Sequence, residues 1–161
     1  MELQLASTSI QELCDSCLSF VKPLALEKNI QLSVQVPEEL APIQVDEERI
    51  REAFINLLSN AVKYTPDGGK VWIEIQPHPT KKYIYFSIVD TGIGIPSDDL
   101  FQLFQPLEPD ESSHTRRANT GLGLLSVQRI VESHGGSVHA ESQLGKGSRF
   151  TIKLPWKNMG E

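Results

Sequence analysis

The segment that decides how this chain folds spans residues 46–65 and reads DEERIREAFINLLSNAVKYT. Its apolar residues recur every three or four positions, which predicts one amphipathic helix that Asp46 caps and that ends near Tyr64. A broad apolar face of this kind must be buried against a second layer of structure. The face consists mainly of Ile50, Phe54, Leu57 and Ala61, and it is widened by Ile55, Leu58 and Val62.

The residues before this helix predict a second helix. The capping box Ser9–Glu12 starts it, and we expect Pro23 to kink it or to begin a further helix. Its apolar stripe consists of Leu13, Cys17, Phe20 and Leu24. The only cysteines, Cys14 and Cys17, form a lone CxxC, so we interpret them as small core residues and not as zinc ligands.

The remaining pattern predicts strands and two further helices, one from Ser97 to about Phe104 and one from Gly121 through His134. Extended segments are predicted at residues 2–6, 30–36, 42–45, 70–76, 83–89, 137–141 and 148–154. The last four should form two hairpins. We therefore expect one domain over residues 1–161 with an α+β fold, a two-layer α/β sandwich in which helices pack on one face of a mixed β-sheet.

The composition excludes several classes of protein. A 161-residue chain with 39% apolar and 22% charged residues is neither disordered nor fibrous. The net charge of −6 argues against a broad surface for nucleic acid or for an anionic membrane, although a local basic pocket is compatible with it. We expect no nucleic-acid partner, no direct membrane contact and a cytoplasmic location.

Polar side chains gather on one side of the helix at residues 46–64. Asn56, Asn60 and Lys63 are spaced i, i+4, i+7 and therefore share a face. Asparagine is a poor helix former, so two of them on one face need a reason. Amide oxygens can bind Mg²⁺ that also carries phosphates, and a lysine can neutralise phosphate charge. The alternative is an ordinary solvated face.

Two glycine-rich loops follow in the sequence. Residues 90–95 read DTGIGI directly after a strand, so a carboxylate stands where the backbone can approach a flat ligand. Residues 119–124 read NTGLGL and open a helix, and free amides at a helix N-terminus bind anions. Arg116 and Arg117 lie just before this second loop, and residues 105–120 form a loop too long to be kept without function.

Together with Phe104–Pro106, His134–Gly136 and the sequence GKGS at Gly145–Ser148, these motifs resemble the catalytic ATP-binding domain of sensor histidine kinases over almost the whole chain. That domain belongs to the superfamily of gyrase, Hsp90, histidine kinase and MutL ATPases, with the Bergerat ATP-binding fold. The resemblance implies a protein-histidine kinase domain of a two-component system. Its cofactors would be ATP and Mg²⁺.

The resemblance also implies a role for each matching residue. Asp90 would accept a hydrogen bond from the adenine amino group, while Gly92, Gly94 and Ile95 would lie along the base. Asn60 and Asn56 would hold Mg²⁺, Lys63 would meet the phosphates, and Tyr64 would pack near the nucleotide or cap the core. Residues 105–120 would be the ATP lid. The phosphates would be held by Thr120, Gly121, Leu122, Gly123 and Leu124, and Arg116 would touch the terminal phosphate.

One position favours a kinase over a hydrolase. By resemblance, members that hydrolyse ATP carry a glutamate four residues before the metal-binding asparagine, where this chain has Asn56. Glu52 lies one turn further back. The nucleophile would then be an imidazole on a separate dimerisation and phosphotransfer domain, which is absent here, and a response regulator would be an indirect partner. The isolated domain would bind ATP or ADP as a monomer.

None of the four histidines stands in the H-E-x-x-T/N-P context of a phosphoacceptor, so we interpret His78, His114, His134 and His139 as structural. The lid base departs from the family pattern at Leu107, Glu108 and Pro109, and Asn119 replaces a glycine. These departures leave two alternatives open. One is a degenerate domain that binds nucleotide or a partner without catalysis, and the other is an ATPase of the same superfamily.

Overall fold

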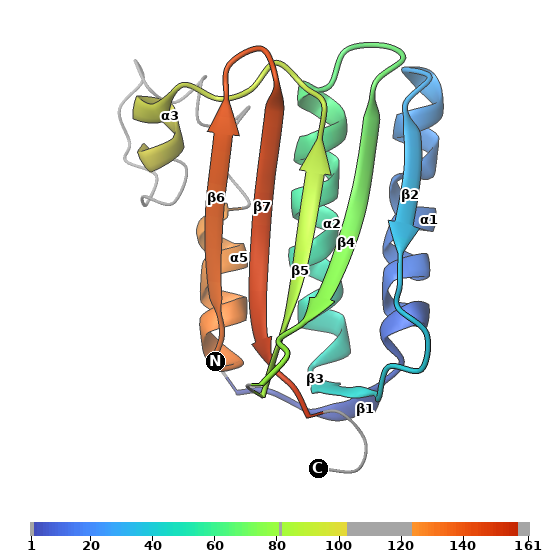
Figure 1. Ribbon diagram of the computed structural model, residues 1–161, viewed down its shortest axis with the longest axis vertical. Coiled ribbons are helices and arrows are strands. Elements are labelled where there is room, and N and C mark those ends of the chain that lie inside the picture. Colours follow the sequence, from blue (N-terminus) through green and yellow to red (C-terminus); the bar gives the residue numbers. More distant parts are fainter. Residues whose placement is uncertain (1, 81, 103–123, 158–161) are drawn as a thin grey trace.

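Five strands form one mixed sheet in the computed structural model, and three helices cover one face of it (Figure 1). The structure describes residues 2–80, 82–102 and 124–157, without the side chains of residues 101 and 102. The strand order is β2-β4-β5-β7-β6, in which β2 runs parallel to β4 and the other neighbours are antiparallel. The predicted two-layer α+β fold is therefore confirmed.

The sheet consists of β2 (Gln31–Gln35), β4 (Lys70–Pro77), β5 (Tyr83–Asp90), β6 (Ser137–Gln143) and β7 (Gly147–Pro155). The helices are α1 (Ile10–Glu27), α2 (Glu47–Tyr64), α5 (Leu124–Ser133) and the short α3 (Ser97–Gln102). A separate two-stranded sheet pairs β1 (Ala6–Thr8) with β3 (Ile43–Val45). The first strand thus begins later than the predicted segment 2–6. The predictions made for residues 103–123, which include the expected ATP lid, concern positions outside the described residues.

The helix at the centre of the helical layer is α2, and its predicted cap and apolar face are confirmed. The Asp46 side chain accepts a hydrogen bond from the Arg49 amide, and Ile50, Phe54 and Leu57 are buried. The Phe54 ring lies 5.1 Å from the Phe86 ring of β5, centroid to centroid, so α2 packs directly on the middle of the sheet.

The predicted face of α1 is wrong in part. Phe20 and Leu24 are 61% and 45% exposed, whereas Leu13 and Cys17 are buried as predicted. The buried face continues every four residues, and it consists of Ile10, Leu13, Cys14, Cys17, Val21 and Ala25. Pro23 does not end the helix. It lies on the exposed side, where a helix can bend to accommodate the ring.

Both cysteines belong to the core, as predicted. Cys14 and Cys17 are free thiols with no exposed surface. Burial raises the pKa of Cys14 to about 12 and that of Cys17 to about 11, so neither is a reactive thiolate at neutral pH. None of the described helices is both long and apolar enough to span a bilayer.

Four long-range hydrogen bonds connect the ends of the helices and the segments next to them. His134 at the end of α5 accepts from the Asp46 amide through Nε2 and donates through Nδ1 to Ile130. The indole N–H of Trp156 donates to the Ala41 carbonyl. Lys28, just after α1, donates to the carbonyls of Val62 (2.8 Å) and Lys63 (3.0 Å) at the end of α2. Apart from the local bond to Ile130, each of these bonds joins segments far apart in the sequence.

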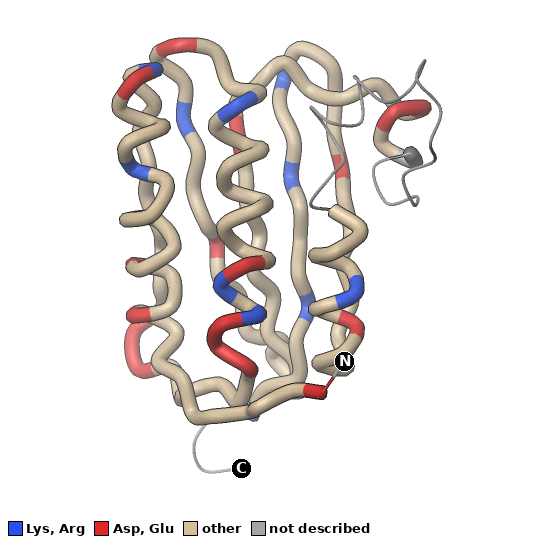
Figure 2. The backbone as a smooth tube through the Cα atoms, turned by 180° about the vertical axis from the view of Figure 1, so that it is seen from behind, with Lys and Arg blue, Asp and Glu red and all other residues tan. Residues whose placement is uncertain are grey.

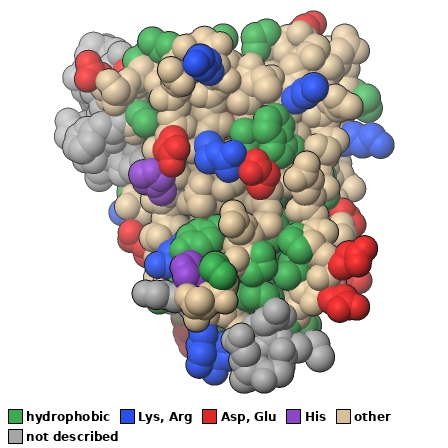
Figure 3. Space-filling view, viewed as in Figure 1, with side chains coloured by type: hydrophobic (Ala, Val, Ile, Leu, Met, Phe, Trp, Pro, Cys, Tyr) green, Lys and Arg blue, Asp and Glu red, His purple; other side chains and the backbone are tan. Residues whose placement is uncertain are grey.

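The opposite face of the sheet carries hydrophobic side chains together with charged ones of both signs (Figure 3). Arg149 of β7 donates two hydrogen bonds to the Glu74 carboxylate of β4, at 3.3 and 3.1 Å, and the Trp72 indole donates to the same group. The Arg149 guanidinium holds the pKa of Glu74 below its usual value. Positive and negative groups alternate here.

Lys28, which donates to the last carbonyls of α2, gives a first test. Replacing Lys28 with methionine keeps most of the aliphatic stem but removes the ammonium donor of the Lys63 carbonyl and one of the two donors of the Val62 carbonyl. We expect a loss of about 1–2 kcal/mol in the free energy of unfolding, measured by urea denaturation. Lys22→Met on the exposed side of α1 is the matched control and should leave stability unchanged. Equal stability of both variants would show that water replaces the lysine at these carbonyls.

Candidate functional site

A narrow slot lies between the helical layer and the sheet, at the end of β5. Its cavity of about 10 Å³ is small. The slot is lined by residues of α2, β5, the loop after β5, α5 and β7. These residues are Asn60, Ala61, Tyr64, Asp90, Ile95, Leu124, Ser148 and Phe150. Five of the site residues predicted from the sequence thus lie at this slot, namely Asn60, Tyr64, Asp90, Ile95 and Leu124.

The polar residues of α2 approach this slot from one side. Asn60 lines it, and Asn56 stands one turn earlier on the same helix, half-buried. Figure 2 shows that the charges of α2 lie in its first half and that the second half is uncharged up to Lys63. The Lys63 ammonium lies 5.8 Å from the centre of the Tyr64 ring. One neutral amide, that of Asn60, therefore lines the slot, and one cation lies near the Tyr64 ring.

Asp90 is the one acidic side chain of the slot. It is only 6% exposed, and one carboxylate oxygen accepts a hydrogen bond of 2.8 Å from the Gly92 amide. Burial raises the pKa of Asp90 above its usual value, while the backbone amides of Gly92 and Ser148 oppose that shift. A carboxylate has about four acceptor sites, so Asp90 can still accept a hydrogen bond from a ligand.

The loop after Asp90 is held against two neighbouring segments. A Cβ at Gly92 would lie 2.5 Å from the Tyr64 carbonyl oxygen, and the Ile93 amide donates to that same oxygen. Gly94 has a φ of +80°, and a Cβ there would lie 2.3 Å from the Gln143 carbonyl oxygen. Both glycines thus permit close approaches within the protein itself.

A pair of serines connects this loop to the β6–β7 hairpin. The Ile95 amide donates to the Ser142 hydroxyl at 2.7 Å, and the Ser142 and Ser148 hydroxyls are 2.8 Å apart. Ser148 and Phe150 line the slot, although the sequence analysis did not name them as site residues. The alternation of the strand at residues 148–154 could have found them, because it turns both side chains toward the helices.

The remaining predicted residues fall into two groups. Arg116, Thr120, Gly121, Leu122 and Gly123 lie outside the described residues. Asn56 and Lys63 are on α2 close to the slot but are not among the residues that line it.

The donor set has a definite metal preference. Over residues 2–80, 82–102 and 124–157 no three His, Cys, Asp or Glu side chains are grouped so that they could hold a metal ion. A zinc or calcium site made by those side chains is therefore not part of the described structure. The amide oxygens of Asn56 and Asn60 fit Mg²⁺, which usually keeps water and takes oxygens from a bound phosphate.

Three of the histidines are described, and two have defined hydrogen bonds. His134 is bonded through both ring nitrogens, and His78 accepts from the Thr80 amide through Nδ1. His139 lies 3.4 Å from the Glu141 carboxylate on the exposed side of β6. His114 lies outside the described residues.

Comparison with protein families gives a match over residues 45–158. The matching family is described as histidine kinase-, DNA gyrase B-, and HSP90-like ATPase. The match begins just before α2 and continues beyond β7, so it contains every residue of the slot.

Individual proteins are similar over most of this chain. The adaptive-response sensory kinase SasA of Synechococcus sp. strain JA-2-3B'a(2-13) is 34% identical over 96% of this chain, which spans 41% of that protein. The sensor histidine kinase WalK of Bacillus subtilis is 34% identical over 84% of this chain, which corresponds to 22% of its length. The chain thus spans less than half the length of these relatives.

Solved structures share the fold. Full-length ShkA in complex with AMPPNP superposes with a TM-score of 0.84 at 30% identity, covering all of this chain and 33% of that protein. The catalytic domain of the histidine kinase ThkA superposes with a TM-score of 0.79 at 24% identity and is covered over 96% of its length.

The buried carboxylate of the slot predicts how stability depends on pH. Because its pKa is higher in the folded than in the unfolded chain, the folded state binds more protons, and stability falls as pH rises through the raised pKa. Asp90→Asn removes this penalty, so we expect it to be more stable than the parent chain at neutral pH. Urea denaturation should show the gain shrinking below the ordinary carboxyl pKa. Asp98→Asn, at an exposed position, is the control. A variant less stable at neutral pH would contradict the prediction.

Proposed function

This chain belongs to the family of histidine kinase-, DNA gyrase B- and HSP90-like ATPases as a domain of the sensor histidine kinase type, and from that premise we propose that it binds Mg-ATP and transfers the γ-phosphate to a histidine of a separate domain. The observation that carries the proposal is the slot, where one buried acceptor, Asp90, stands opposite the amide face of α2.

The slot has the groups that an adenine base requires. Asp90 offers a buried carboxylate as acceptor for the exocyclic amine, and its orientation is already held by the Gly92 amide. Tyr64, Ile95 and Leu124 offer apolar surface for the faces of the base. Because the cavity is only about 10 Å³, the base enters by moving side chains apart, and Leu124 at the start of α5 is the one we expect to move.

The phosphates would extend from the slot along α2. Asn60 and Asn56 would bind the magnesium ion, and Lys63 would contribute positive charge one turn further on. When bound, Mg²⁺ neutralises charge on the phosphate oxygens. Arg116 and the amides of residues 120–123 would complete the phosphate site from the lid, as the family resemblance implies.

The residue type at position 56 supports transfer over hydrolysis. Asn56 is neutral, and Glu52 lies a further turn back on an exposed part of α2. A water molecule at the terminal phosphate would thus lack a nearby base. A neutral imidazole needs little proton removal before it attacks, so alignment and charge neutralisation suffice for transfer.

The acceptor would be supplied from elsewhere. His134 holds α5 to α2 through both ring nitrogens, and His78 is bonded in a turn, so these two serve the fold. The relatives are more than twice as long as this chain, so they contain further segments that could include a dimerisation and phosphotransfer domain. We propose such a domain as the partner of this chain, in the cytoplasm. ADP would be released, and a response regulator would receive the phosphate later.

Calorimetry with Mg-ATP tests the binding step. We expect Asp90→Ala to weaken binding about tenfold to a hundredfold, because a hydrogen bond to a buried charge is lost. Asn60→Ala should remove the dependence of affinity on magnesium, whereas Ser59→Ala on the same helix should bind as the parent chain does. Undisturbed binding by both site variants would refute the assigned pocket.

Transfer needs a separate assay with a purified dimerisation domain and labelled ATP. We expect label on that domain's histidine and little release of free phosphate by this chain alone. Steady phosphate release that is lost in Glu52→Ala would instead identify an ATPase. Normal ATP binding without transfer, restored by Leu107→Phe with Pro109→Arg, would identify a degenerate domain.

A further inference from the structure

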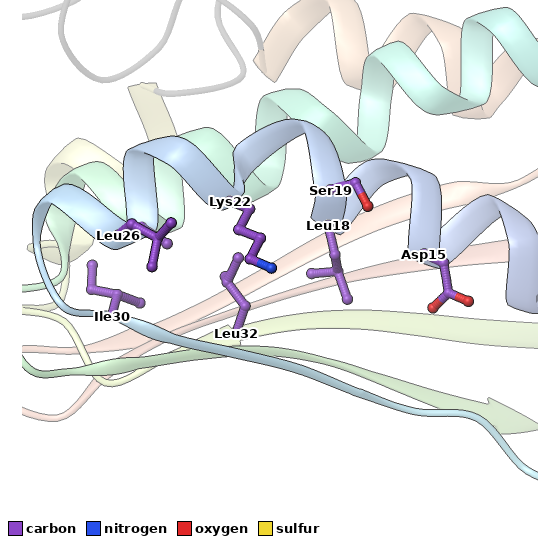
Figure 4. Close-up of a pocket in the computed structure, with 8 residues that line it drawn as sticks. Asp15, Leu18, Ser19, Lys22, Leu26, Ile30 and Leu32 are labelled. Atoms are coloured by element: carbon purple, nitrogen blue, oxygen red, sulfur yellow. The ribbon is translucent and has the colours of Figure 1, made fainter.

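A groove separate from the slot runs between α1 and the edge strand β2 (Figure 4). Its cavity is about 430 Å³, far larger than the slot. Leu18 and Leu26 of α1 and Leu32 of β2 form apolar walls, and Leu26 is 64% exposed. Covering an exposed leucine beside an open, partly apolar groove is favourable, because it removes apolar surface from water.

The edge of β2 is free for pairing. The Gln31 amide donates to Gly69, so the backbone groups of alternate residues point toward β4 and those of Leu32 and Val34 point outward. Within the described chain β2 has no neighbour on that side. Gln31–Gln35 also contains no charge or proline of the kind that protects edge strands. The other edge strand, β6, is contacted by α3.

We propose that this edge binds an extended segment of a separate partner protein, which adds a strand antiparallel or parallel to β2 and places alternate side chains in the groove. Main-chain hydrogen bonds to Leu32 and Val34 would provide affinity, and the groove would select side chains. A helix could cover the same leucines but would leave these backbone groups unpaired. The free edge therefore favours an extended guest.

The charge of the groove indicates which side chains the bound segment should carry. Figure 4 shows Lys22 reaching from α1 toward β2, and within the described structure it has no ion-pair partner. Asp15 at the end of the groove accepts a hydrogen bond of 2.9 Å from Gln11. The guest should thus carry an acidic side chain among its groove-facing apolar residues, opposite Lys22.

A second copy of this chain fits this groove poorly. Its own edge strand, Gln31–Gln35, offers no carboxylate for Lys22. A two-fold contact would also bring two copies of Lys22 to the same interface, because such contacts use one patch twice. The charge of this edge therefore favours an extended segment that carries its own carboxylate over the edge strand of a second copy.

The test uses a fluorescent peptide in which valine and threonine alternate and one central valine is replaced by glutamate. We expect it to bind, and Lys22→Glu to weaken binding about tenfold. Exchanging the peptide's glutamate for lysine should restore binding to Lys22→Glu. Lys82→Glu, at an exposed position in the turn before β5, is the matched control and should bind as the parent chain does. Mg-ATP affinity should be unchanged in both variants, which separates this surface from the nucleotide site.

Hydrogen exchange reports the binding mode directly. The bound peptide should slow exchange of the Leu32 and Val34 amides, while the Ser33 amide, which already faces β4, should change little. A peptide with prolines at its hydrogen-bonding positions should not bind. Three results would each overturn the proposal. The first is tighter binding of a helical peptide of equal composition, and the second is peptide affinity that Lys22→Glu leaves unchanged. The third is self-association of the chain that Lys22→Glu abolishes.

Discussion

The structure of the site depends on the contact between the carbonyl end of α2 and the loop that follows β5. Helix ends leave carbonyl groups without partners, and here the protein supplies them. Lys28 donates to two of these carbonyls, and the Ile93 amide donates to that of Tyr64. Gly92 makes the contact possible, because a Cβ would lie 2.5 Å from the Tyr64 oxygen. This contact holds Asn60 of α2 and the carboxylate of Asp90 at one slot.

The electrostatics of the slot oppose stability and favour ligand recognition. Asp90 is buried among apolar neighbours, which raises its pKa, and two backbone amides recover only part of the lost hydration. A buried acceptor that is not fully satisfied can gain a hydrogen bond when a ligand arrives. Proteins tolerate such unfavourable groups mainly at functional sites. The Phe54–Phe86 contact is part of the buried core around α2, whose packing favours the folded state.

Sequence patterns predicted the helices and strands of this fold better than they predicted which side of each helix is buried. The helix at residues 46–64 was predicted with its cap and its buried residues, because its apolar spacing and its capping residue agree. On α1 the apolar residues are too many for one face, and the sequence analysis selected Phe20 and Leu24, which are exposed. Only the position of α1 beside α2 and over β2 decides that Val21 and Ala25 point inward.

The sequence by itself determined the layer architecture, the strand pairings of both hairpins and the residue types of the site, because periodicity, turns and motifs are local properties of the chain. Tertiary structure alone decided which of those residues meet. Asn60 and Asp90 are thirty positions apart, and Ser148 and Phe150 come from the last strand, yet all line one slot. It also decided that Gly92 and Gly94 accommodate the protein's own backbone and that β2 ends the sheet with a free edge. Distance between remote residues depends on packing, and local sequence does not encode it.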